Sequence, residues 1–134
     1  MKKISLLYTG FFLVALLAGI HFVAEALYLY WTVWWFDSFV HLLAGLSGGT
    51  VAVWFLFDSG IFYKQSPNVR EAIFTALVCM IIAGTLWEVF EYTNDIMQPE
   101  VGYISDTILD LIMDATGAVL AGLIGARKIF HADQ

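Results

Sequence analysis

Hydrophobic and polar positions divide this chain into four long apolar blocks separated by polar, turn-forming connections. The blocks cover residues 4–30, 36–57, 71–92 and 106–130. Each block approaches or exceeds the ~20 residues that a helix needs to cross a bilayer. The connections at 58–68 and 94–103 contain proline and glycine, which interrupt helices. We therefore predict one all-α domain over residues 1–134, an integral membrane four-helix bundle with up-down topology.

Composition supports a membrane protein and excludes other classes. Hydrophobic residues make up 60% of the chain and the mean hydropathy is +0.80, whereas soluble domains are roughly 45–50% apolar. The net charge of −6 and the lack of a basic cluster argue against nucleic acid as a partner. The lone Cys79 cannot form an internal disulfide. The expected partner is the lipid bilayer, and a homo-oligomer or a larger membrane complex stays open.

The first block has an alternative interpretation as a secretory signal peptide. It begins with Lys2 and Lys3, continues with an apolar stretch and reaches a small-residue motif at 24–26. The apolar stretch is longer than a usual signal segment, and an aromatic LYLYW follows it directly. These features favour an uncleaved membrane span.

Basic residues predict the orientation in the membrane. All six lie at the start of the first block, in the second connection or at the end of the fourth block: Lys2, Lys3, Lys64, Arg70, Arg127 and Lys128. Lysine and arginine near helix ends favour the cytoplasmic side. We therefore expect both termini in the cytoplasm of a bacterium, with the protein in its cytoplasmic (inner) membrane.

Acidic residues have the opposite distribution. Nine of the twelve fall outside or in the outer half of the predicted bundle: Glu25, Asp37, Glu88, Glu91, Asp95, Glu100, Asp106, Asp110 and Asp114. No lysine or arginine shares that half. Because a charge in the middle of a bilayer costs roughly 2.5–3.5 kcal/mol on insertion scales, several unpaired carboxylates need a bound cation, protonation or a water-filled vestibule.

Helical spacing gathers these acids and two histidines on inward-facing stripes. Positions three, four and seven apart share one helix face, and small residues follow on the stripes of the second and fourth blocks, which lets helices approach closely. The predicted site residues are His41, Glu88, Asp110 and Asp114 at the centre, with Asp37, Glu91, His21 and Glu25 around them. Asp106 also fits a simple helix-start acid, favoured by the helix dipole.

A divalent metal cation is the sharpest hypothesis for this cluster. Imidazole with carboxylates suits zinc, manganese or iron, whereas carboxylates with water suit magnesium or calcium. The competing interpretation is that each histidine only hydrogen-bonds to a nearby acid within the helix packing. The sequence does not give the identity of the ion.

Several functions stay open at this point. The sequence contains no HExxH, GxSxG or P-loop motif. The candidates are a structural cation site, a metal-dependent enzyme acting on a lipid-linked phosphate, a proton- or cation-coupled transport element, and an accessory subunit of a larger membrane complex. Against transport, no ionisable groups continue the site through the cytoplasmic half of the last three blocks.

Three stretches carry a resemblance to known families. FDSFVHLLAGLSGG, WEVFEYTND and SDTILDLIMDATGAVLAG resemble the YjdF-type family of small bacterial membrane proteins and, more distantly, VanZ-like proteins. Asp37 with His41 fits the VanZ-like D-x-x-x-H, while Glu91 and Asp114 replace a glutamine and an asparagine of that pattern. The resemblance implies a four-helix protein of the cell envelope and no established reaction.

Overall fold

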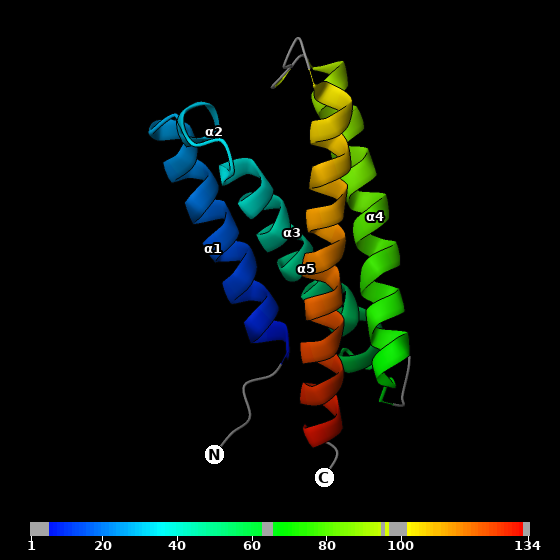
Figure 1. Ribbon diagram of the computed structural model, residues 1–134. Coiled ribbons are helices and arrows are strands. Elements are labelled where there is room, and N and C mark those ends of the chain that lie inside the picture. Colours follow the sequence, from blue (N-terminus) through cyan, green and yellow to red (C-terminus); the bar gives the residue numbers. More distant parts are fainter. Residues whose placement is uncertain (1–5, 63–65, 95, 97–101, 133–134) are drawn as a thin grey trace.

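The chain folds into four long helices and two short helical segments. The computed structural model describes residues 6–62, 66–94, 96 and 102–132, and its secondary structure is helical, with no strand in these ranges. The elements are α1 (Leu6–Ala26), α2 (Leu29–Thr32), α3 (Phe36–Val53), the π-helical turn η1 (Trp54–Asp58), α4 (Val69–Thr93) and α5 (Tyr103–Ala132) (Figure 1).

Local sequence determines where two of the long helices end or begin. α1 stops at Ala26, and Tyr28 takes a left-handed backbone conformation with φ of 56°, so the chain turns before α2 instead of continuing as one helix to residue 30. At the start of α4, Asn68 and Glu71 form a capping box in which each side chain accepts from the other's backbone N–H. This pair satisfies amides that the first helical turn leaves free.

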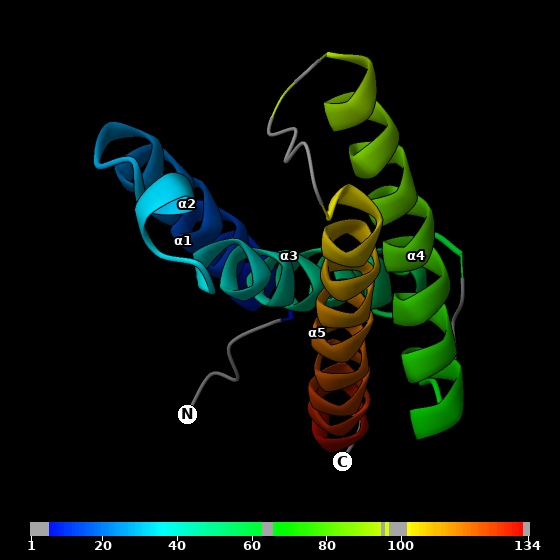
Figure 2. The ribbon, with the colours of Figure 1, turned by 45° about the horizontal axis from the view of Figure 1, so that its top comes forward.

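The helices pack as a central group of three with a fourth on the outside. α5 packs against α3 and α4, and α1 packs mainly against α3. In both views α3 passes behind α5, from the side of α1 to the side of α4 (Figures 1 and 2). At the lower end, the Lys128 ammonium donates a 2.6 Å hydrogen bond to the Thr9 hydroxyl, which joins α5 to α1.

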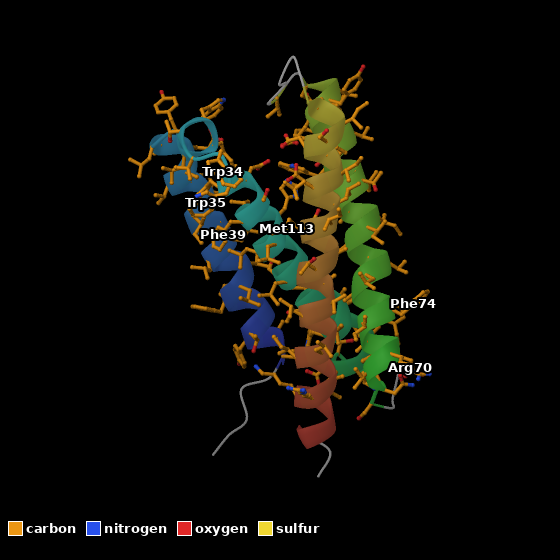
Figure 3. The ribbon with its side chains drawn as sticks, viewed as in Figure 1. Trp34, Trp35, Phe39, Arg70, Phe74 and Met113 are labelled. Carbon is orange, nitrogen blue, oxygen red and sulfur yellow. The ribbon has the colours of Figure 1, made fainter. Side chains whose placement is uncertain are left out.

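Length and hydropathy make the four long helices candidates for membrane spans. The candidate spans are Leu6–Ala26, Phe36–Asp58, Val69–Thr93 and Tyr103–Ile129. Large apolar side chains cover their outer faces, as expected where lipid replaces water. Trp34 and Trp35 lie near the upper end and Arg70 near the lower end in Figure 3.

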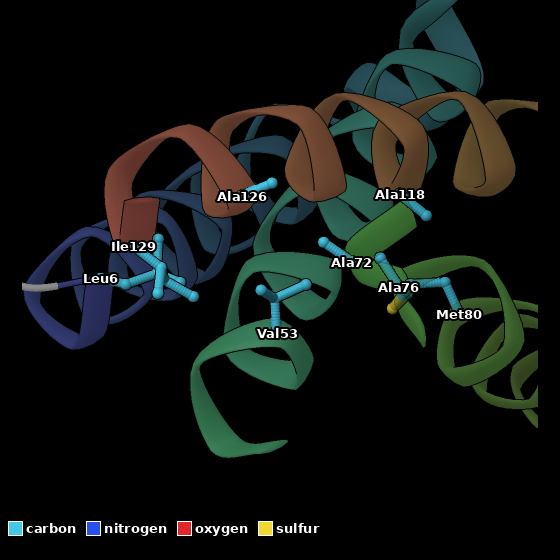
Figure 4. Close-up of a cluster of buried hydrophobic side chains, with 8 residues drawn as sticks. All are labelled: Leu6, Val53, Ala72, Ala76, Met80, Ala118, Ala126 and Ile129. Atoms are coloured by element: carbon cyan, nitrogen blue, oxygen red, sulfur yellow. The ribbon is translucent and has the colours of Figure 1, made fainter. Parts of the chain in front are cut away.

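Small residues allow α3 and α5 to approach closely. A Cβ atom added to Gly45 would lie 2.8 Å from the Cα of Asp114, and one added to Gly117 would lie 2.9 Å from the carbonyl carbon of Gly45. Below this crossing lies an apolar core (Figure 4). The core consists of Leu6, Val53, Ala72, Ala76, Met80, Ala118, Ala126 and Ile129. The close approach of the α3 and α5 backbones at Gly45 and Gly117 therefore lies next to the polar side chains of these helices.

Candidate metal centre

His41 lies between α3 and α5 at the centre of three carboxylates, of which Asp110 and Asp114 are buried and Asp37 is half-buried. Its Nε2 is 4.0 Å from Oδ1 of Asp37 and 4.0 Å from Oδ2 of Asp110. Its Nδ1 donates a 3.3 Å hydrogen bond to Oδ2 of Asp114. A proton on Nδ1 leaves the Nε2 lone pair facing the other two carboxylates. Ligand atoms of Asp37, His41 and Asp110 lie within 4.8 Å of one another, so these three residues could hold a metal ion.

The cluster is buried, yet some of its carboxylate oxygens have no partner among the described residues. The exposed fractions are 7% for His41, 3% for Asp110 and 2% for Asp114. Among the described residues, three buried carboxylate oxygens have no hydrogen-bond partner: Oε1 of Glu88, Oδ1 of Asp110 and Oδ1 of Asp114. A buried polar atom without a partner costs about 1–3 kcal/mol. The arrangement therefore favours a cation or a proton from outside the described side chains.

Helical register and close backbone packing bring these groups together. Asp37 and His41 are one turn apart in the first half of α3, and Asp110 and Asp114 are one turn apart on α5. The contact at Gly45 and Gly117 brings the two pairs to the same depth. Asp106, in the first turn of α5, is only half-buried.

Glu88 lies beside the cluster on α4. Its Oε2 accepts a 2.8 Å hydrogen bond from Thr107, and its backbone carbonyl accepts a 3.3 Å hydrogen bond from the Tyr103 hydroxyl. We did not expect either partner from the sequence. Thr107 precedes Asp110 by three positions and Asp114 by seven, so helical spacing does place it on their face.

The remaining predicted residues line a cavity next to the cluster. His21 and Glu25 from α1 and Glu91 from α4 line it, whereas Asp37, His41 and Asp114 border both the cavity and the cluster. Tyr30, which the sequence did not indicate, also lines this cavity and shares a 2.8 Å hydrogen bond with Nδ1 of His21.

The Tyr30 hydroxyl stays protonated at neutral pH. Burial and the nearby charges of Asp37, Glu25 and Glu91 raise the pKa of Tyr30 to about 12. The hydroxyl therefore keeps its proton in the hydrogen bond that it shares with Nδ1 of His21.

The eight predicted site residues thus divide into two groups. Asp37, His41, Asp110 and Asp114 meet directly, with Glu88 next to them. His21, Glu25 and Glu91 occupy the cavity wall and are not in the three-residue metal group. Five other charged residues named from the sequence lie outside the described residues: Lys2, Lys3, Lys64, Asp95 and Glu100.

Comparison with known proteins places the chain in a family. Residues 1–129 match the family described as "Predicted membrane protein (DUF2238)". The chain belongs to this family. An uncharacterized protein of Thermotoga maritima is 29% identical over 112 residues, which cover 79% of this chain and 55% of the relative. The chain thus spans about half the length of that relative. No solved structure matches it.

Proposed function

We propose that this protein is a multi-pass membrane protein that binds one divalent cation between α3 and α5. Asp37, His41 and Asp110 would supply the ligands. One observation carries the proposal: Nε2 of His41 faces two carboxylates while its Nδ1 is bonded to the third, Asp114. Metal-binding histidines have this arrangement, in which a carboxylate on the far nitrogen orients the ring and makes it a better ligand.

The donor set favours zinc, manganese or iron over magnesium or calcium. An imidazole nitrogen is a ligand for the transition ions, whereas magnesium and calcium take oxygen ligands. Zinc binds nitrogen and oxygen at about 2.0–2.2 Å in a tetrahedral arrangement, which puts the ligand atoms roughly 3.4 Å from one another. An ion would therefore draw the carboxylate oxygens slightly inward from their 4.0 Å separations from Nε2 of His41. Asp110 comes from α5 and the other two ligands from α3, so the ion would link the two helices.

We infer a structural role for the cation, because it would neutralise charge where the helices pack most closely. Without it, Asp37, Asp110 and Asp114 surround one imidazole in a buried place. Like charges at such distances repel each other strongly when water is excluded. The cation would therefore stabilise the upper half of the α3–α5 pair.

Calorimetric titration of zinc and manganese into the protein in lipid nanodiscs tests the proposal. The unmodified protein should bind one ion per chain, and Asp110→Asn should weaken binding at least about tenfold because it removes an anionic ligand. Glu91→Gln is the matched control, since Glu91 lies on the cavity wall and outside the metal group. Equal affinity of Asp110→Asn and the unmodified protein for both ions would refute the proposal.

We also propose that the four long helices cross a bacterial cytoplasmic membrane in alternate directions, with both termini in the cytoplasm, as a YjdF-type protein. The start of α1 and the end of α5 share the lower end in Figure 1, and Arg70, Arg127 and Lys128 belong to that end. This distribution fits the positive-inside rule. A green fluorescent protein fused to the C-terminus should fluoresce in cells, whereas alkaline phosphatase fused there should stay inactive; the reverse pattern would invert the topology.

A further inference from the structure

The cavity beside the cluster has one apolar end and one acidic end. Its volume is about 680 Å³, it is partly open, and residues of α1, α3 and α4 form most of its wall. Toward the lower end the wall is apolar, with Val14, Leu17, Met80 and Ala83. Toward the upper end the same helices contribute Glu25, Asp37 and Glu91, whereas Asp114 of α5 lies deeper, beside Gly84 of α4. The cavity is therefore amphipathic along the helix axes.

The acidic end carries the three carboxylates of Glu25, Asp37 and Glu91, and no described lysine or arginine lines the cavity. Burial and the charges of Asp37, Glu25 and Glu91 raise the pKa of Tyr30, which lines the cavity with them. Asp114 also lines the cavity and is 2% exposed; its Oδ2 accepts a hydrogen bond from His41, and its Oδ1 has no hydrogen bond among the described residues. The aromatic residues Phe22, Tyr30 and Trp87 also line the cavity.

We propose that this cavity binds a lipophilic ammonium compound with a single apolar chain. The chain would lie along the apolar wall, and the ammonium head would lie among Glu25, Asp37 and Glu91. Carboxylates offset the cost of placing a cation in a dry site, and aromatic rings attract quaternary ammonium groups. An anionic head group would find no basic side chain at this end of the described cavity.

The volume of the cavity limits the size of the ligand that it can hold. Pockets of about 300–1,000 Å³ enclose drug-sized molecules, and 680 Å³ falls in this range. A phospholipid with two chains and an amine head group is larger than such molecules. The ammonium site shares Asp37 with the metal group, but Glu25 and Glu91 lie outside that group and Asp110 does not line the cavity, so variants can separate the two sites.

Binding of dodecyltrimethylammonium tests the proposal, with dodecyl sulfate as a probe of equal chain length and opposite charge. The protein is placed in phosphatidylcholine nanodiscs after chelator treatment, and empty nanodiscs give the baseline. We expect saturable binding of the cation only. The Glu25→Gln, Glu91→Gln double variant should bind it at least about tenfold more weakly, since both charges at the head group are lost.

Asp110→Asn separates this proposal from the metal site. It should lose divalent-cation affinity and keep the ammonium affinity. The double glutamine variant should keep divalent-cation affinity and lose the ammonium affinity. Both glutamate positions are exposed or half-buried, so the glutamines should leave the fold intact, which a thermal unfolding curve checks. Equal binding of the two probes, unchanged ammonium affinity in the double variant, or loss of probe binding when phosphatidylethanolamine replaces phosphatidylcholine would overturn the proposal.

Discussion

The α3–α5 pair has two halves that pack equally closely but differ in whether all their buried groups have partners. In the lower half, Val53, Ala118 and Ala126 pack in an apolar core and each is at most 3% exposed. In the upper half, His41, Asp110 and Asp114 are buried nearly as deeply, and two carboxylate oxygens there have no partner among the described residues. The same close approach of small residues thus produces a fully packed apolar core at one end and a polar site with unpartnered oxygens at the other.

The difference has a physical cause. Apolar side chains in a membrane protein need only close van der Waals packing with their neighbours. A buried carboxylate needs hydrogen bonds, a counter-charge or a proton. The lower half therefore needs only the protein's own atoms to be stable, whereas the buried carboxylates of the upper half need a bound cation or a proton. Mutations should separate the two halves by whether their effect depends on added metal.

The largest effect should come from separating the two helices. Gly117→Ala places a methyl group against the backbone of α3, near the carbonyl carbon of Gly45. We expect a loss of about 3 kcal/mol in the free energy of unfolding, because packed backbones cannot yield without moving apart, and weaker metal binding as well. Denaturant-induced unfolding in detergent measures the first effect and calorimetry the second.

Gly19→Ala is the matched control for this change. Gly19 lies inside α1, and an added Cβ there meets no atom within 4 Å. The substitution should leave stability unchanged or raise it by up to about 1 kcal/mol through helix propensity. Equal losses in the two variants would show that the close approach at Gly117 has no special role.

Asp114→Asn should separate metal affinity from the stability of the metal-free protein. Loss of the carboxylate that orients His41 should weaken zinc binding about 10–100-fold. The metal-free variant should nevertheless be at least as stable as the metal-free parent, since a neutral amide costs less to bury than a carboxylate whose Oδ1 has no partner among the described residues, and the amide oxygen can still accept from His41. Calorimetry and chelator-treated unfolding curves measure the two quantities, and a less stable metal-free variant would contradict the expectation.

Val53→Ala should show the reverse behaviour. Val53 is fully buried in the apolar core, so removal of its two methyl groups should cost about 2 kcal/mol of stability. The metal affinity should stay within about threefold of the parent, since the helix backbones can keep their places. Unfolding curves with and without zinc should shift by the same amount. A shift seen only with zinc would show that the apolar core and the metal site are coupled.

Asp106→Asn should have the smallest effect. Asp106 lies in the first turn of α5 and is only half-buried. Loss of its interaction with the helix dipole should lower stability by about 0.3–1 kcal/mol and leave zinc affinity unchanged. A tenfold fall in zinc affinity would instead add Asp106 to the metal site.

The sequence was sufficient to predict the four candidate spans, because length and hydropathy decide them. It also predicted His41, Asp110 and Asp114 at the centre of a site, since four-residue spacing and small neighbours act locally; it put Glu88 there too and Asp37 at the edge, whereas the structure brings Asp37 to His41 and Asp110. Tyr30 escaped notice because its contact with His21 depends on the turn at Tyr28, a tertiary feature without a helical period. His21, Glu25 and Glu91 share the polar faces, yet helix spacing alone does not tell which face borders a cavity and which a closed contact.

The metal content of the purified protein tests the central proposal most directly. Elemental analysis should compare the parent with the Asp110→Asn, Asp114→Asn double variant, both purified in neutral detergent without chelators. We predict about one zinc, manganese or iron ion per chain in the parent and almost none in the variant, since the variant loses one anionic ligand and the carboxylate that orients His41. Equal and negligible metal in both samples would contradict the proposal and indicate protonated carboxylates instead.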